Sequence, residues 1–431
     1  MTAAADRVAK RRVAVVGGGI AGLSAACFLS PRHDVTLYEA EPRLGGHART
    51  VRAGSSGLPV DTGFIIFNKP NYPHLWKLFE RLDIPRTRSE MSFSVSLDAG
   101  GFEYALKPKG AMRGILAQPR NGFDPKYWGL FRDILRFNAS AETAAAGASG
   151  QSLRDLLDAL GTGDWFRDRF LLPLTGAIWS VPTERALDFP AQGLIRFLGN
   201  HGLLSHRNHP QWYTVAGGSE VYVSRLGALL QSQGVELRIG APVTRITRRP
   251  GQVQICAAGE WRSFDQVVLA LHADQVLPLL EAPSEAEHRA LSAIRFQKNP
   301  AILHSDPAAM PRRRAAWASW NFLGRRAPLT GALSMTYWMN ALQTGLPRSR
   351  PMFVSLNPDF PIDPDLIHDR VTFEHPIFDL PAERAKQALA HLNGDRATWY
   401  CGAWMQNGFH EDGIASAAQV AKSMIRVPSA E

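Results

Sequence analysis

The sequence has few cysteines and no disulfide or zinc pattern. Its three cysteines, Cys27, Cys256 and Cys401, are far apart and show no CxxC spacing. A disulfide framework and a structural zinc site are therefore disfavoured, and a reducing cytoplasm is the natural location. We expect no metal site.

Long hydrophobic runs are also missing. The longest apolar stretches, residues 20–29 and 267–280, are short or interrupted by polar side chains such as Ser24 and Asp274. Neither is long enough for a transmembrane helix. No apolar segment of a signal peptide follows the basic first residues. We expect a cytoplasmic protein whose membrane contact, at the inner face of the cytoplasmic membrane, is peripheral.

The composition is that of an ordinary globular protein, with 45% hydrophobic and 20% charged residues in a chain of 431. This excludes a disordered, collagen-like or coiled-coil chain. The 48 basic residues exceed the 39 acidic ones, so the net charge is +9. An anionic partner is indicated. Because no recognition motif accompanies the charge, we expect no nucleic-acid partner.

A strand–turn–helix–strand unit begins the folded chain. Residues 12–16 form a β-rich apolar run, and Gly17, Gly19 and Gly22 follow at GxGxxG spacing before a helical pattern. The glycines allow a tight turn, close approach of a pyrophosphate and close packing of helix on strand. The pyrophosphate would lie on the backbone of Ile20 and Ala21 at the start of the helix. Glu39, followed by Ala40, ends the next strand and is placed to bind a ribose.

Further elements follow from the hydrophobic pattern. Helices are predicted at residues 75–82, from Asp124-Pro125 onward, 219–230, 382–392 and 413–425. Strands are predicted at residues 34–38, 235–239, 243–247, 253–255, 267–271 and 398–401. The Ala/Gly/Ser-rich residues 140–150 are predicted to be a connection.

The residues after Glu39 indicate the cofactor. Gly45, Gly46 and His47 are followed by Arg49, and this segment resembles the flavin-containing amine oxidoreductase superfamily. In that family a second Gly-Gly and a following arginine help to hold the pyrophosphate of FAD. Here His47 stands where most members have the arginine, and Arg49 comes two residues later.

Other segments extend the resemblance over nearly the whole chain. The segment Val60-Asp61-Thr62-Gly63-Phe64 is similar to the family segment that passes the flavin ring. Val243 is similar to the family residue whose backbone meets the adenine. A C-terminal FAD motif is formed by Gly402, Phe409, Asp412, Gly413 and Ile414. The resemblance implies that Gly413 and Ile414 open a helix facing the flavin. No cysteine lies in residues 372–378, where some members attach FAD, so we expect non-covalent FAD.

The resemblance also bears on the substrate. Amine oxidases flank the substrate with two aromatic rings, and only one of them has a counterpart in this sequence, Phe409. The lysine that is common in the family also has no exact match, because Lys298 is out of register with it. The segments around His47, Phe64 and Trp317-Ala-Ser-Trp320-Asn321 are similar to a bacterial subgroup linked to cyclopropane-fatty-acid-synthase-like methyltransferases and furan fatty acid synthesis. This similarity implies a methylated unsaturated acyl chain as substrate and a methyltransferase as a partner.

Three polar side chains are candidate catalytic acids or bases near the flavin: His375, His410 and Glu411. Imidazole titrates near neutral pH, which suits proton transfer. Alternatively, His410 and Glu411 only cap the final helix. For Asp61 we expect a structural role, the fixing of a loop.

Residues 104–137 combine basic and aromatic side chains. The segment contains only two acidic residues but seven basic ones: Lys107, Lys109, Arg113, Arg120, Lys126, Arg132 and Arg136. Its apolar residues recur at helical spacing: Trp128, Phe131, Ile134 and Leu135. Such a segment can dock on an anionic membrane surface. The alternative is a solvated basic helix face.

We therefore predict an α/β protein: a Rossmann-type, GR2-like FAD-binding domain with amine-oxidase topology and an inserted mixed α+β substrate domain. The FAD-binding domain comprises residues 1–80, 211–295 and 396–431, and the substrate or cap domain residues 81–210 and 296–395. The expected activity is FAD-dependent desaturation of a phospholipid acyl chain. The alternatives are an oxidase of a soluble amine and a non-catalytic, FAD-stabilised partner of a lipid methyltransferase.

Overall fold

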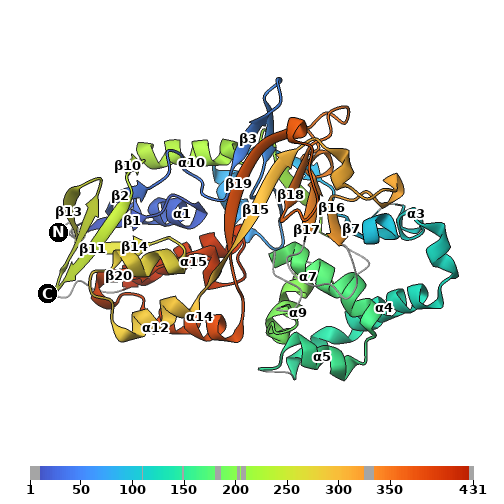
Figure 1. Ribbon diagram of the computed structural model, residues 1–431. Helices are drawn as coiled ribbons and strands as arrows, with labels where there is room; N and C mark the ends of the chain where they lie inside the picture. Colours follow the sequence, from blue (N-terminus) through green and yellow to red (C-terminus); the bar gives the residue numbers. More distant parts are fainter. Residues whose placement is uncertain are drawn as a thin grey trace, which may run out of the picture. The chain divides into compact units, whose positions relative to one another are not determined.

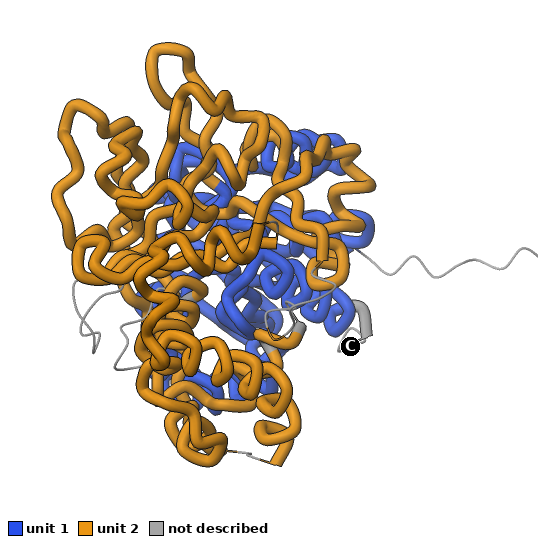
Figure 2. Tube along the Cα trace, turned by 90° about the vertical axis from the view of Figure 1, so that its right-hand side faces the viewer, with its two compact units in different colours: residues 1–48, 222–295, 381–431 blue, residues 49–221, 296–380 orange. Residues whose placement is uncertain are grey.

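The computed structural model describes residues 10–426 except 109, 148–149, 180–185, 201–203, 205–209 and 325–333. The chain forms two compact units (Figure 2). Unit 1 comprises residues 1–48, 222–295 and 381–431, and unit 2 comprises residues 49–221 and 296–380. Each unit is thus assembled from segments that lie far apart in the sequence.

A five-stranded, fully parallel sheet forms the centre of unit 1 (Figure 1). The order of its strands is β10 (Glu236–Ile239), β2 (Asp34–Glu39), β1 (Arg12–Val16), β14 (Gln266–Leu269) and β20 (Thr398–Tyr400). The apolar side chains of β1 and β14 are buried, as expected for strands that are covered on both faces. Strands from the beginning, the middle and the end of the chain therefore complete one sheet.

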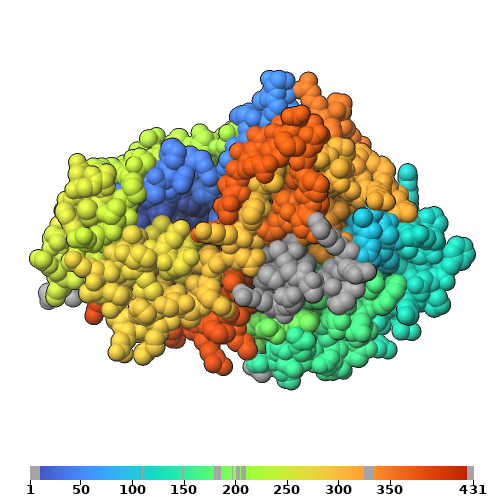
Figure 3. Space-filling model, viewed as in Figure 1, coloured from blue at the N-terminus to red at the C-terminus, as the bar shows by residue number. Residues whose placement is uncertain are grey.

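Six α-helices lie wholly or mostly in unit 1 of the described chain. They are α1 (Ile20–Leu29), α10 (Glu220–Ser232), α11 (Ala273–Val276), α12 (Glu285–Ala293), α14 (Leu380–Leu392) and α15 (His410–Arg426). Short 3-10 turns span Leu277–Leu279, Asp395–Ala397 and Ala403–Met405. A small antiparallel sheet is formed by β11 (Val243–Arg249), β12 (Gln252–Ala257) and β13 (Glu260–Phe264). On the face drawn in Figure 3, the surface of unit 1 shows all three of its chain segments side by side.

Helices α1 and α15 pack closely on one another. Nearly every residue of α1 is buried, because its sequence is apolar on all sides. A methyl group on Gly413 of α15 would lie 2.9 Å from Ile20 Cγ2, so glycine is needed for this approach. The two ends of the folded chain are therefore joined directly in unit 1.

Unit 2 is built on a seven-stranded mixed sheet. Its order is β19 (Ile367–Pro376), β15 (Phe296–His304), β18 (Phe353–Leu356), β17 (Ser334–Trp338), β16 (Trp320–Gly324), β7 (Phe93–Leu97) and β8 (Phe102–Leu106). Two smaller sheets pair β3 (Thr50–Ala53) with β4 (Leu58–Asp61), and β5 (Ile66–Asn68) and β6 (Arg86–Ser89) with β9 (Trp212–Val215).

Most helices of unit 2 come from one segment between β8 and β9. They are α3 (Ala111–Ile115), α4 (Pro125–Ala146), α5 (Leu153–Leu160), α6 (Asp164–Phe166), α7 (Leu172–Trp179) and α9 (Ala191–Asn200), with a π-helical turn at Arg167–Leu171. Elsewhere lie α2 (Pro73–Arg81) and α13 (Met339–Leu342), and 3-10 turns span Asp98–Gly100, Pro119–Phe123, Pro307–Ala309, Arg314–Ala316 and Pro364–Leu366. No helix in the described part of the chain is long and apolar enough to cross a membrane.

The predicted α/β class is confirmed, and so are the strand–turn–helix–strand unit and the cap of α4, where the side chain of Asp124 accepts from Lys126 N. The predicted connection at residues 140–150 is wrong as far as Ala146, because the alanines favour helix and extend α4. The final helix begins at His410 rather than at Gly413, since Asp412 satisfies the amide of Phe409 immediately before it.

The boundaries of the compact units differ from the predicted domain boundaries. Residues 49–80 belong to unit 2, because β3 pairs with β4 and β5 pairs with β9 there. Residues 381–395, which include most of α14, belong to unit 1. The division at residue 295 is the same in both descriptions.

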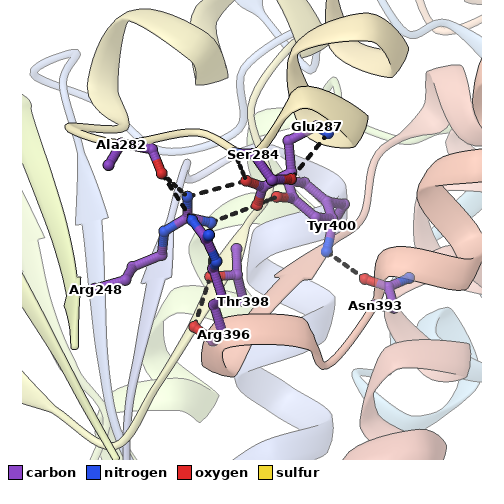
Figure 4. Close-up of polar contacts among 8 residues, drawn as sticks. All are labelled: Arg248, Ala282, Ser284, Glu287, Asn393, Arg396, Thr398 and Tyr400. Atoms are coloured by element: carbon purple, nitrogen blue, oxygen red, sulfur yellow. Dashed lines mark hydrogen bonds and ion pairs between the residues drawn. The ribbon is translucent and has the colours of Figure 1, made fainter. Parts of the chain in front are cut away.

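A buried ion pair holds β11, α12 and β20 together in unit 1 (Figure 4). The side chains of Arg248 and Glu287 are only 3% and 4% exposed. Arg248 donates to both carboxylate oxygens of Glu287, and Tyr400 OH donates to Glu287 Oε1 at 2.6 Å. Glu287 also accepts from Ser284 N at 2.7 Å, which completes a capping box at the start of α12. This network fixes Tyr400, and with it the chain that leads to Gly402.

The same contacts determine the protonation of Glu287. Burial alone would raise the pKa of this carboxyl, but the hydrogen bonds from Arg248 and Tyr400 outweigh it and lower the pKa to about 2. The unfolded carboxyl titrates near 4.5. The pair therefore stabilises the fold above this pH, and its contribution is lost as the pH falls toward 2.

Replacement of Glu287 by glutamine should destabilise unit 1 by about 3–5 kcal/mol at pH 7, because Arg248 is left charged and unpaired in a buried site. The difference from the wild type should shrink at pH 3, because the carboxyl is protonated in the unfolded state there while the folded carboxylate, with a pKa of about 2, is still mostly ionised. Urea unfolding followed by circular dichroism at both pH values measures this. Glu285→Gln, in an exposed pair with Arg289, is the matched control. Equal stability of the two variants at pH 7 would contradict the prediction.

Candidate functional site in unit 1

The turn between β1 and α1 can be built only with glycine at two positions. Gly17 has φ +107°, and a methyl group there would lie 2.6 Å from the carbonyl oxygen of Ala270. A methyl group on Gly22 would lie 1.8 Å from Gly17 O. At Gly19, by contrast, a methyl group would meet nothing within 4 Å. The turn is therefore closed on the protein side and open at Gly19.

The start of α1 offers its backbone amides at this opening. Its N-cap, Gly19, has no side chain to cap the helix, and the first turn contains no acidic residue. Ile20, Ala21 and Gly22 are buried. Amides at the start of a helix have no partner within the helix, and together with the helix dipole they favour an anion. The geometry suits a pyrophosphate that lies against Gly19.

Glu39 lies beside this turn at the end of β2. Its Oε2 accepts from Gly18 N at 2.6 Å, and its Oε1 accepts from Glu41 N at 2.8 Å. These bonds hold the carboxylate in place and leave each oxygen with room for another donor, such as a ribose hydroxyl. Ala40, the next residue, is exposed.

The second glycine pair forms a loop against the first. Gly45 and Gly46 both have positive φ, and Gly45 N donates to Gly18 O at 2.9 Å. A methyl group on Gly46 would lie 3.2 Å from Gly19 Cα. Arg43 holds this loop by donating to Gly46 O at 2.9 Å and to Ala48 O at 3.1 Å. This role of Arg43 was not predicted from the sequence, although an arginine two residues before a glycine pair could have indicated it.

His47 extends the same loop. Its ring lies 5.6 Å from the ring of His272, which follows β14. Val243, at the beginning of β11, pairs with Ala257 and is half-buried. Both residues thus belong to the unit that contains the glycine turn, as the proposed dinucleotide site requires.

The C-terminal motif surrounds the beginning of α15. Asp412 Oδ2 accepts from Phe409 N at 2.9 Å and from Asn407 N at 3.2 Å, so this carboxylate caps the helix. Burial raises the pKa of Asp412 to about 6, although both of these hydrogen bonds act in the opposite direction. Gly402 N donates to Ser416 Oγ at 3.0 Å, and Ile414 is buried. The cap role that we considered for this region belongs to Asp412.

His410 is held at the same helix end by Tyr222. The hydroxyl of Tyr222 and His410 Nε2 are 2.9 Å apart. Burial, followed by the nearby His47, lowers the pKa of His410 to about 3. The imidazole is therefore neutral at physiological pH and is suited to hydrogen bonding rather than to bearing charge. Glu411, the next residue, is half-buried.

The remaining candidates are in unit 2. Arg49 forms a two-pronged ion pair with Asp369, at 2.7 and 3.1 Å, and reaches Thr62 Oγ1 at 3.3 Å. Its guanidinium group is thus engaged within unit 2. Gly63 and Phe64 follow Thr62 and are half-buried, and the ring of Phe64 stacks on Phe67 at 6.2 Å.

Asp61 joins three distant segments of unit 2. Its Oδ1 accepts from Thr50 Oγ1 at 2.6 Å and from Ser219 N at 2.8 Å, and its Oδ2 accepts from Gln343 Nε2 at 3.1 Å. Burial raises the pKa of Asp61 to about 6, while the hydrogen bonds oppose this. These contacts agree with the loop-fixing role expected for Asp61.

His375 lies on β19, where Nδ1 is 3.1 Å from Asn299 Nδ2 on the neighbouring β15. Its ring is parallel to that of Phe373. Lys298 is exposed and pairs in register with Glu374. The structure therefore gives His375 a positioned ring, and it places Lys298 on the exposed side of β15.

The tryptophan-containing segment at residues 317–321 is structural in unit 2. The amide of Asn321 is buried and bonds on both sides, accepting from Ala318 N at 2.9 Å and donating to Thr336 O at 2.9 Å. Trp317 packs in a core cluster with Met310 and Phe353.

The cysteines and the potential metal ligands lie as follows in the described ranges. Cys27 and Cys401 are buried, and burial raises the pKa of the Cys401 thiol to about 12. Among the residues that the structure describes, no group of three or more His, Cys, Asp or Glu side chains is arranged to hold a metal ion.

Known proteins resemble this chain in sequence and fold. Carotenoid phi-ring synthase of Streptomyces griseus is 27% identical over 304 residues, which cover 63% of this chain and 54% of that protein. Protoporphyrinogen oxidase of Bos taurus is 26% identical over 321 residues, which cover 66% of this chain and 64% of that protein. The chain thus spans about half to two thirds of the length of these relatives.

A solved structure, the CLA-producing fatty acid isomerase from P. acnes, has the same fold with a TM-score of 0.69 and 18% identity, and the match covers 97% of this chain and 99% of that one. The model of the family "Flavin containing amine oxidoreductase" matches residues 20–302, well over half of the chain. Together with the dinucleotide-binding geometry of unit 1, this match shows that the chain belongs to the flavin-containing amine oxidoreductase family of FAD-dependent enzymes.

Proposed function

We propose that the protein is an FAD-dependent oxidoreductase that desaturates a methylated, unsaturated fatty acyl chain of a membrane phospholipid. One observation carries the oxidoreductase class: the opening at Gly19, which Glu39 and Gly46 border and at which the amides of α1 begin. A dinucleotide cofactor fits this combination of glycine, acid and helix terminus.

Each part of unit 1 then has a distinct task. The backbone of Gly19, Ile20 and Ala21 would hold the pyrophosphate, and Glu39 would hold the ribose. When bound, FAD supplies a hydride acceptor at its flavin N5 atom. The positive end of α15 would favour negative charge on the flavin ring. Arg43 keeps the glycine loop closed without contributing to the chemistry.

Desaturation requires only one proton transfer to the protein, besides the hydride transfer to the flavin. An allylic C–H next to an existing double bond is a far better hydride donor than an isolated methylene group, so the main requirements are orientation and exclusion of water. A neutral His410, with its pKa near 3, adds no charge that an apolar chain would have to desolvate. His375, positioned by Asn299, is the candidate to accept the proton from the substrate.

The acyl substrate is supported by three similarities. The segments around His47, Phe64 and Asn321 are similar to the subgroup linked to lipid methyltransferases, for which a methyltransferase partner is also proposed. The relatives include a carotenoid enzyme, and a fatty acid isomerase shares the fold.

The main alternative is an oxidase of a soluble amine, which the description of the matched family favours. A further alternative is an FAD-stabilised scaffold without a substrate. The three differ in what reduces the flavin, so one experiment separates them.

Anaerobic mixing of the purified yellow protein with phospholipids tests the substrate class. We expect lipids with a methylated unsaturated chain to bleach the flavin absorbance, because their allylic hydrogens are activated and a methyl group on the double bond further stabilises the charge left by hydride loss. The unmethylated and saturated analogues, and a panel of amines, serve as controls. Bleaching by an amine alone would favour the oxidase, and a flavin that no lipid or amine reduces would favour the scaffold.

A second prediction tests the cofactor site itself. Gly19→Ala should leave the fold intact, because the backbone there has φ −73° and the added methyl group meets nothing in the protein. The methyl group would occupy the space of the pyrophosphate, so bound flavin should fall about tenfold or more, as expected from a loss of roughly 1.4 kcal/mol or more in binding.

Flavin content is read from the absorbance of the purified protein, and folding is read from circular dichroism. Gly345→Ala, at an exposed glycine with open space around it, is the control and should retain full flavin. A yellow Gly19→Ala variant with the flavin content of the control would contradict the proposed site.

A further inference from the structure

We infer that unit 2 carries a docking surface for anionic phospholipid membranes, formed by the side chains of Met112, Phe123, Trp128 and Leu135 and the basic residues among them. This inference goes beyond the proposed reaction. It concerns binding alone, so it can fail or hold independently of any substrate.

Exposed apolar side chains are concentrated in this segment. Among the described residues, six large hydrophobic side chains are exposed, and four of them lie within residues 112–135. Phe123 is 88% exposed, Met112 58%, Leu135 52% and Trp128 44%. Single exposed apolar residues are ordinary, but a cluster on successive elements indicates an interaction site.

The segment that presents these side chains is held in place. Trp128 Nε1 donates to Gly122 O at 2.8 Å, and Tyr127 OH donates to Ile115 O, so α4 is tied to both the loop and α3. Asp124 N donates to Asn121 O at 3.1 Å, which closes the turn around Phe123. Phe123 is therefore exposed on a fixed turn rather than on a loose one.

Helix α4 has two different faces. Tyr127, Ile134 and Phe137 are buried and attach the helix to unit 2. Trp128, Arg132 and Leu135, at the spacing i, i+4 and i+7, form an exposed stripe on another face. The α3–α4 segment, coloured cyan to teal, lies at the outer edge of unit 2 in Figure 1 and is uncovered on the face drawn in Figure 3.

The charge around the apolar side chains is positive. Five basic side chains of this segment are exposed: Arg113, Arg120, Lys126, Arg132 and Arg136. The two acidic residues are engaged, since Asp124 caps α4 and the buried Asp133 accepts from Gly163 N. Lys109 lies outside the described residues.

The combination points to a lipid surface. Apolar tips can enter the acyl boundary while neighbouring lysine and arginine side chains meet phosphate groups, a pattern typical of interfacial binding. Nucleic acid offers phosphates but no apolar phase for Phe123, and an acidic protein partner is the remaining competitor.

Sedimentation of the full-length protein with vesicles tests this surface. The wild type should bind vesicles of phosphatidylcholine that contain phosphatidylglycerol, and binding should weaken as salt is added or as phosphatidylglycerol is omitted. Phe123→Ser/Trp128→Ser and, separately, Arg113→Glu/Lys126→Glu should each reduce the partition coefficient by about tenfold or more. Retained flavin and an unchanged thermal midpoint would show that the variants are folded.

Matched controls come from unit 1. Trp261→Ser removes an equally exposed aromatic ring, and Arg245→Glu/Arg249→Glu reverses two exposed charges on β11. Both controls should bind vesicles like the wild type. Absence of vesicle binding by the wild type, or equal binding by all variants, would overturn the inference. Wild-type binding to an acidic protein but to no vesicle would do the same.

Discussion

The close approach of backbone to backbone at the β1–α1 turn is the constraint on which the site depends. Gly22 comes so near to Gly17 O, and Gly17 to Ala270 O, that no side chain can be accommodated. This contact brings the first turn of α1 to the end of the central strands, where its amides point at the opening beside Gly19. Glu39, the Gly45–Gly46 loop and α15 are then placed by their contacts with this turn or with α1.

Much of unit 1 could be predicted from the sequence because its signals are local. A β-rich run, glycines at fixed spacing and an acid at the next strand end all lie within residues 12–39. Local signals were also sufficient for the helix after Ser219 and, in unit 2, for the cap of α4 by Asp124. Local rules failed at residues 140–146, where helix propensity and the packing of α4 outweigh a glycine- and serine-rich composition.

Contacts between distant residues could not be predicted in this way. The partner of Arg248 is 39 residues away, and Arg49 finds Asp369 across 320 residues. No local sequence pattern links residues so far apart, because only the folded chain brings them together. Contacts of this kind also separate the roles of neighbouring residues: the half-buried His410, which lies near His47, is neutral, and Asp412, not Glu411, caps the final helix.

The strand order of unit 1 has a consequence for how the protein is made. The edge strand β20, at Thr398–Tyr400, and helix α15 are synthesised after the other described helices and strands, yet β20 completes a sheet that includes β1 and α15 packs on α1. A nascent chain on the ribosome therefore displays β14 without its neighbour β20 until residues 398–400 have been made. Until that segment has emerged, the β14 edge of the sheet has no partner strand and α1 lacks the helix that packs on it.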